Sequence, residues 1–137
     1  GVEKDLSKSH VITDFILMAI KNNKIKMLTN GQEKRDFLYA EDCCEGLEQI
    51  YINFNKIKKI KKSVDLTTGK YTSILNIAKI IKKLLKKNKV KIEPSKNKDI
   101  VQMDKRNKPD MFLKKYWKPK FSLEAGIQEI IKYYNLK

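Results

Sequence analysis

Two arginines are the side chains of this sequence best suited to bind a phosphate group. The chain carries 31 basic residues, of which only Arg35 and Arg106 are arginines. A guanidinium presents a rigid fork of N–H donors that matches a pair of phosphate oxygens, whereas a lysine ammonium acts as a point charge. The alternative for either arginine is a structural ion pair, which for Arg106 would use Asp104 or Asp110.

The residues around Arg35 predict how its side chain is positioned. A turn at Gly31 precedes it, and a short strand is expected at residues 36–39. A side chain mounted on or beside a strand is stiffer than one on a loop. Asp36 and Asp42 are expected to serve in a salt bridge and a helix cap, because no base accompanies them.

The other potentially reactive residues favour structural roles, and no metal site is expected. The single histidine, His10, lies at an expected helix start. Two Tyr-x-x-x-Lys spacings occur, at 116–120 and 133–137; Pro119 interrupts the first, and the second lies at the end of the sequence. The adjacent Cys43 and Cys44 have the spacing of neither a structural disulfide nor a zinc site, which favours a reduced, cytoplasmic setting.

Composition describes a small, strongly basic chain with enough apolar residues to fold. It has 137 residues, a formal net charge of +15 and 41% hydrophobic residues. Lysines occur in every segment, whereas sequence-specific nucleic-acid binding favours arginines and aromatics concentrated on one element. No apolar run approaches the length of about 20 residues that a membrane span needs. We therefore expect neither specific nucleic-acid binding nor membrane insertion.

Apolar periodicity predicts an α/β fold with four to five helices and a few short strands. Strands are expected at residues 25–28, 36–39, 64–66 and 90–92. Helices are expected after Ser9, Asp42, Ser73 and Ser122. The helix after Asp42 should turn Leu47, Ile50, Tyr51 and Phe54 inward, and the helix after Ser73 should turn Ile74, Ile77, Ala78, Ile81, Leu84 and Leu85 inward. Such short strands make a poor sheet by themselves, so one apolar face should remain uncovered.

The segment Gly31-x-x-x-Arg35-Asp36-Phe37-x-Tyr39-x-x-Asp42 resembles a motif of the extended short-chain dehydrogenases, the NAD-dependent nucleotide-sugar epimerases and dehydratases. Residues 9–16, 64–69, 72–74 and 117–126 resemble further segments of that family in the same order. The resemblance covers nearly all 137 residues and corresponds to the C-terminal third or so of such an enzyme. The family's Gly-x-x-Gly-x-x-Gly turn and catalytic Tyr-x-x-x-Lys pair would lie upstream, so no catalytic residue is expected here.

The resemblance implies four substrate-binding residues. Arg35 takes the position of the family's diphosphate-contacting arginine. Leu28 stands where relatives often place an aromatic over the base; the alternative is an ordinary strand residue in the core. Lys96 replaces the arginine of an Arg-x-x-Asp element. Arg106, with Pro109-Asp110, resembles the Arg-x-Pro-Asp of some sugar-nucleotide decarboxylases, with one extra residue before the proline.

These observations predict that residues 1–137 form the nucleotide-sugar-binding C-terminal segment of an NAD(P)-dependent epimerase or dehydratase. NAD or NADP would bind to a Rossmann half outside this chain, and the complete enzyme would be a homodimer. Two alternatives stay open: a small Lys-rich module that binds nucleic acid or another polyanion, and an inactive product of a split or truncated gene.

Overall fold

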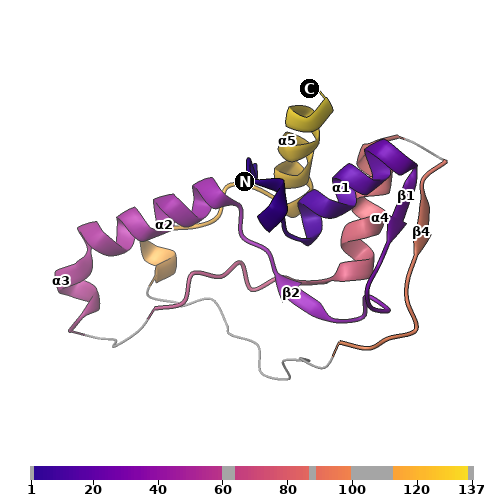
Figure 1. The fold of residues 1–137 in the computed structure, drawn as a ribbon. Helices are drawn as coiled ribbons and strands as arrows, with labels where there is room; N and C mark the ends of the chain where they lie inside the picture. Colours follow the sequence, from indigo (N-terminus) through magenta and orange to yellow (C-terminus); the bar gives the residue numbers. More distant parts are fainter. Residues whose placement is uncertain (1, 60–63, 87–88, 100–112, 136–137) are drawn as a thin grey trace.

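The computed structural model describes residues 2–59, 64–86, 89–99 and 113–135. Helices dominate this part of the chain, and the strands are few and short, which confirms the predicted α/β class (Figure 1). In chain order the elements are η1 (Leu6–Lys8), α1 (Val11–Asn22), β1 (Lys24–Lys26), β2 (Lys34–Asp36), α2 (Ala40–Ile52), α3 (Phe54–Ile57), β3 (Tyr71–Ser73), α4 (Ile74–Leu84), β4 (Lys91–Glu93), η2 (Leu113–Lys115) and α5 (Leu123–Asn135). None of the described helices is both long and apolar enough to cross a bilayer.

The core lies where α1, α4 and α5 meet beside β1 (Figure 1). The prediction for α4 is confirmed, because Ile74, Ile77, Ala78 and Ile81 are buried. Ser73 caps this helix by accepting a hydrogen bond from the Asn76 amide at 3.2 Å. Apolar residues three or four positions apart share one face of a helix, so each of the three helices buries one stripe. The largest apolar side chains with almost no exposed surface in this core are Ile16, Ile25, Ile77, Ile81, Val90 and Ile127.

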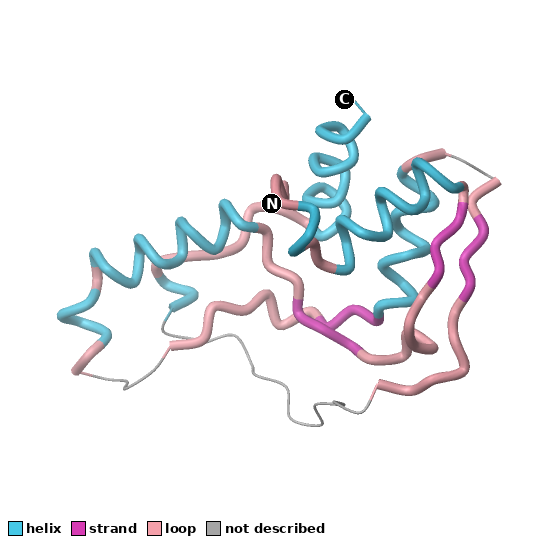
Figure 2. Tube along the Cα trace, in the orientation of Figure 1, coloured by secondary structure: helices cyan, strands magenta, loops and turns pink. Residues whose placement is uncertain are grey.

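The strands form two separate pairs. β1 and β4 are parallel, with Ile25 opposite Ile92, and Figure 2 shows them side by side. β2 and β3 are antiparallel, with Arg35 opposite Thr72. The predicted strand at residues 36–39 is wrong beyond Asp36, and residues 64–66 form no strand. A loop replaces the strand predicted at residues 64–66. The Asp36 carboxylate accepts hydrogen bonds from the Thr67 and Thr68 hydroxyls and from the Gly69 amide, and these bonds hold the chain in a turn.

Helix α2 faces the opposite way from the prediction. Leu47 is 56% exposed and Tyr51 is 83% exposed, whereas Asp42 and Gly46 are buried. Asp42 is not the helix cap, because the helix begins at Ala40. Its carboxylate instead accepts hydrogen bonds from the backbone amides of Lys120 and Phe121, at 2.9 and 3.0 Å. The expected uncovered apolar face is therefore the outer face of α2.

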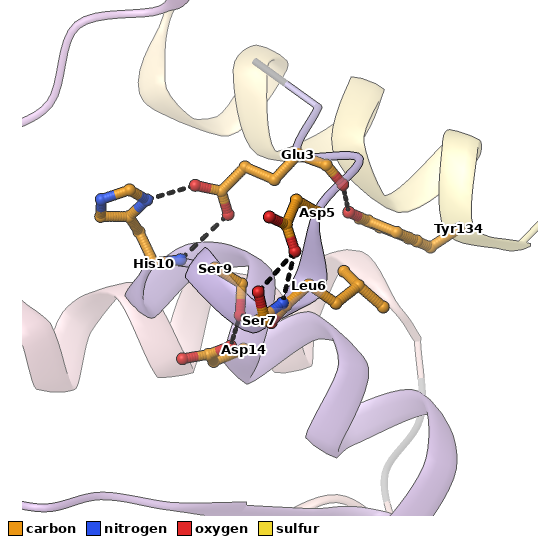
Figure 3. A network of polar contacts seen from close by, with 8 residues as sticks. All are labelled: Glu3, Asp5, Leu6, Ser7, Ser9, His10, Asp14 and Tyr134. Carbon is orange, nitrogen blue, oxygen red and sulfur yellow. Dashed lines mark hydrogen bonds and ion pairs between the residues drawn. The ribbon is translucent and has the colours of Figure 1, made fainter.

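Polar contacts join the N-terminal segment to α1 and α5 (Figure 3). The Tyr134 hydroxyl donates to the backbone carbonyl of Glu3 at 2.6 Å. The Glu3 carboxylate accepts from the His10 amide at 3.0 Å and also contacts the His10 ring. Ser9 was predicted as the cap of α1, but His10 holds that position and Ser9 donates to Asp14 instead. A helix-end role for His10 is thus confirmed.

The Glu3 contacts predict a loss of stability in acid. Burial alone would raise the pKa of Glu3, but hydrogen bonds from Thr13 and His10, with the charge of His10, lower it to about 2. A carboxyl whose pKa is lower in the folded state stabilises the fold above its unfolded pKa, which is 4.5 here. This contribution should disappear as the pH falls from about 4.5 to about 2. Urea denaturation should show Glu3→Gln less stable than wild type at pH 6 and equal to it near pH 2. An equal deficit at both pH values would contradict this assignment, and Glu48→Gln on exposed α2 surface is the control.

Candidate functional site

The β1–β4 pairing continues past both strands and forms the base of the candidate site. The Met27 amide donates to the Glu93 carbonyl at 2.9 Å, the Ser95 amide to the Thr29 carbonyl at 3.0 Å, and the Asn30 amide to the Asn97 carbonyl at 2.7 Å. These bonds extend the contact between the two segments beyond the paired residues 24–26 and 91–93. Residues 27–30 and 93–97 therefore run side by side, although more than sixty positions separate them in the sequence.

The turn at Gly31 leads from this pairing into β2. Gly31 has a φ of +72°, a backbone conformation that residues with a Cβ rarely adopt. Its carbonyl accepts from the Leu75 amide at 2.9 Å, and the Glu33 carbonyl accepts from the Ile74 amide at 3.1 Å. The turn is thereby fixed to the first turn of α4, and β2 starts from a defined position.

Arg35 projects from the middle of β2 and is held at two of its nitrogens. Nη2 lies 2.6 Å from Oδ2 of Asp99, and Nη1 donates to the Lys34 carbonyl at 3.2 Å. The side chains of Arg35 and Asp99 are 38% and 23% exposed. The structural ion pair considered from the sequence is thus present. It occupies only part of a guanidinium with five N–H donors, and the pair remains accessible from solvent.

The structure brings together three of the four predicted binding residues. Leu28 lies on the paired segment 27–30, Lys96 lies on its partner segment, and Arg35 reaches Asp99 just beyond Lys96. Leu28 is 88% exposed, so the alternative of a core strand residue is wrong. Lys96 is exposed as well. Arg106 lies outside the described residues.

Sequence reasoning gave too little weight to the acidic residues around Arg35. Asp99, the aspartate of the element in which Lys96 replaces the arginine, is the direct partner of Arg35, a contact that the sequence did not predict. Glu33 is buried, accepts a 2.5 Å hydrogen bond from the Thr29 hydroxyl, and keeps Oε2 without a hydrogen bond to any described residue. Asp36 holds the 67–69 turn against β2. The available signal was the position of Glu33 and Asp36 on either side of Arg35.

Neither Tyr-x-x-x-Lys spacing forms a catalytic pair in the described part of the chain. Tyr116 follows η2, and Lys120 lies on an irregular segment, so the two do not share a helical face. Lys120 instead contacts Glu45 at 2.6 Å, and this hydrogen bond raises the pKa of the lysine. Tyr133 lies on α5, and Lys137 is outside the described residues. Within the described part of the chain, no cluster of three or more His, Cys, Asp or Glu side chains could hold a metal ion.

A groove lies next to the Arg35 strand. It runs between β3, the first turns of α4 and the segment that enters α5, and it presents polar and basic side chains beside apolar ones. Its lining includes Phe37, Thr68, Lys70, Thr72, Asn76, Lys120, Phe121 and Glu124. Arg35 does not line this groove, although Thr72, the residue opposite it on β3, does.

Known proteins resemble this chain in both sequence and fold. Residues 1–64 match the model of the NAD dependent epimerase/dehydratase family. UDP-glucuronic acid decarboxylase 1 of Danio rerio is 27% identical over 139 residues, which cover 98% of this chain and 31% of that protein. The corresponding decarboxylase of Xenopus tropicalis is 28% identical with the same coverage.

Solved structures give the same result for the fold. UDP-glucose 4-epimerase of Thermotoga maritima, solved with UDP-glucose, has a TM-score of 0.72 at 18% identity, over 94% of this chain and 40% of the epimerase. dTDP-glucose 4,6-dehydratase of Bacillus anthracis, solved with NAD, has a TM-score of 0.70 at 21% identity, over 93% of this chain and 39% of the dehydratase. The chain thus spans about a third of the curated relatives and about two fifths of these structures. The predicted resemblance to the NAD-dependent epimerase/dehydratase family is confirmed: residues 1–64 match its model, and the curated and solved relatives are similar to nearly the whole chain.

Proposed function

We propose that residues 1–137 are the nucleotide-sugar-binding, C-terminal segment of an NAD(P)-dependent sugar-nucleotide epimerase, dehydratase or decarboxylase. The observation that carries this proposal is the position of Arg35, on a strand fixed at both ends, with its guanidinium bound to Asp99 on the segment that carries Lys96 and pairs with that of Leu28. The relatives named above act on UDP- and dTDP-sugars, as their names state. In the proposed enzyme the chain works in the cytoplasm, within a homodimer.

Each site residue has a role that follows from its chemistry. Arg35 binds the two phosphates with the N–H donors that Lys34 and Asp99 do not use, as a guanidinium does with paired oxygens. Lys96 adds a second positive charge at the same edge. Leu28 supplies an exposed apolar surface for the base. Arg106 is assigned to the same substrate through its motif alone.

The dinucleotide does not fit the residues of this chain. Its glycines, Gly1, Gly31, Gly46, Gly69 and Gly126, stand singly and form no phosphate-binding turn of the Gly-x-x-Gly-x-x-Gly kind. We therefore assign NAD or NADP, and the acid–base residues, to a part of the enzyme outside these 137 residues. This segment contributes by binding and orienting the sugar nucleotide, which places the reacting hydroxyl where the cofactor can reach it.

Substitution of Arg35 in the complete protein tests the proposal. A hydrogen bond to a charged group contributes about 1.5–3 kcal/mol, so Arg35→Ala should weaken UDP-glucose binding by at least about tenfold. Arg35→Lys keeps the charge but loses the fork, and it should recover only part of that affinity. Calorimetric titration of wild type and both variants measures the effect, with the exposed neighbour Lys34→Ala as control. Unchanged affinity in Arg35→Ala would remove Arg35 from the site.

A further inference from the structure

One contact ties the end of the Arg35 side chain to a segment that is distant in the sequence. Nη2 of Arg35 lies 2.6 Å from Oδ2 of Asp99, and 64 positions separate the two residues. The guanidinium also donates from Nη1 to the Lys34 carbonyl at 3.2 Å, but that acceptor belongs to the preceding residue of the same strand. Among the described residues, Asp99 is therefore the side chain that holds the guanidinium from outside β2.

Both members of this ion pair are mounted on paired backbone. β2 pairs with β3, where Arg35 stands opposite Thr72. The segment that leads to Asp99 is bound to residues 27–30, and these bonds include one of 2.7 Å from the Asn30 amide to the Asn97 carbonyl. The contact thus joins two elements whose backbones are already placed. It restrains the guanidinium more than an ion pair between two long, freely rotating surface side chains would.

The Arg35–Asp99 pair is also less exposed than an ordinary surface pair of this chain. Its side chains are 38% and 23% exposed. Lys132 and Glu129 on α5 form a pair of nearly the same length, 2.7 Å, with side chains that are 58% and 45% exposed. Because partly buried charges are screened less by solvent and salt, the Arg35–Asp99 contact is the stronger restraint of the two.

We propose that Asp99 is a positioning residue for the diphosphate that acts through Arg35, and this proposal rests on the proposed function. A freely rotating arginine side chain loses rotational freedom when it binds a ligand, and that loss reduces the affinity. With Nη2 bound to Asp99, the guanidinium is oriented before the ligand arrives. The N–H donors that Asp99 and Lys34 do not use remain for the phosphate oxygens.

The charge of Asp99 makes a positioning role distinguishable by the sign of one effect. A carboxylate and a diphosphate are both negative, so Asp99 repels the ligand directly. If Asp99 did not orient Arg35, removing its charge would strengthen the binding of a diphosphate. If Asp99 does orient Arg35, removing its charge weakens that binding in spite of the repulsion that is lost. Asp99→Asn makes this change with almost no change of side-chain shape.

Titration of UDP-glucose and uridine into the complete protein tests the proposal. We expect Asp99→Asn to weaken UDP-glucose about three- to tenfold, within the range of couplings measured between residues in contact, and to leave uridine almost unchanged. Asp99→Glu keeps a carboxylate and should recover part of the affinity for UDP-glucose. The matched control is Glu129→Gln, which removes the carboxylate of the exposed α5 pair and should change neither ligand.

A double-mutant cycle with Arg35→Ala shows whether Asp99 acts through Arg35. In the Arg35→Ala background, Asp99→Asn should no longer weaken UDP-glucose, because no guanidinium is left to orient. A merely structural role for Asp99 would instead lower the affinity for UDP-glucose in both backgrounds and would lower the affinity for uridine as well.

Three outcomes would overturn the positioning role of Asp99: unchanged or stronger UDP-glucose binding in Asp99→Asn, the same loss with and without Arg35, or an equal loss for uridine. If Arg35→Ala still weakened UDP-glucose, these outcomes would leave the proposed function standing. If Arg35→Ala had no effect, the diphosphate assignment of Arg35 would fail, and the positioning role would fail with it. The two failures are therefore distinguishable.

Discussion

Replacing Asp42 with Ala is expected to lower the free energy of unfolding by about 3 kcal/mol or more, since each hydrogen bond to a charged group contributes about 1.5–3 kcal/mol. The Asp42 side chain is buried, and its two oxygens accept the amides of Lys120 and Phe121. Ala would leave both amides without an acceptor and release the segment that enters α5.

The Asp42 prediction can be checked by urea denaturation of wild type and a small set of variants. Asp42→Asn retains one acceptor oxygen and should lose roughly half as much stability. The neighbouring Glu41 is exposed, so Glu41→Ala should stay within about 0.5 kcal/mol of wild type. If Asp42→Ala were no worse than Glu41→Ala, the assignment of Asp42 as the bridge between α2 and α5 would be wrong.

Gly31→Ala is expected to destabilise the chain by more than about 2 kcal/mol, because a left-handed backbone costs about 1–2 kcal/mol for a residue with a Cβ and steric conflict adds to it. The new Cβ would lie 2.8 Å from the backbone nitrogen of Leu75 and 2.2 Å from the Met27 side chain. The methionine can move, but the Leu75 nitrogen belongs to the start of α4 and cannot move independently of it.

Gly69→Ala separates the two causes of the Gly31 effect. Gly69 has a similar φ of +70° but lies in an exposed turn. Both variants carry the backbone cost, and the excess in Gly31→Ala measures the conflict with α4. We also expect Gly31→Ala, and not Gly69→Ala, to weaken sugar-nucleotide binding, because it displaces the strand that carries Arg35. Equal stability losses in the two variants would contradict the steric account.

Periodicity predicted the elements that pack within the chain and misjudged those that depend on other contacts. The stripe of α4 was predicted correctly because its partners, α1 and α5, are present. For α2 the same reasoning identified an apolar face, but no described residue packs on this face and it points to solvent. Helical spacing identifies a face that needs burial; it does not identify what buries it.

The sequence selected candidate residues for the site but only part of their contacts. The motif around Arg35, and the scarcity of arginine, made this residue a candidate before any geometry was known. Its partner Asp99 lies 64 positions away, and only the parallel pairing of β1 with β4 brings the two together. Long-range pairing of three-residue strands leaves little signal in the sequence. The loop at residues 64–69 was missed for a similar reason, since the Asp36 carboxylate holds it.

The most direct test of the central claim compares the affinities of two ligands, with and without a diphosphate, for two forms of the protein, with and without Arg35. Uridine and UDP-glucose are titrated into the complete protein, in wild type and in Arg35→Ala. If Arg35 binds the diphosphate, the substitution should weaken UDP-glucose by at least about tenfold and leave uridine almost unchanged. An equal loss for both ligands, or no loss for either, would contradict the claim that this chain holds the nucleotide sugar through Arg35.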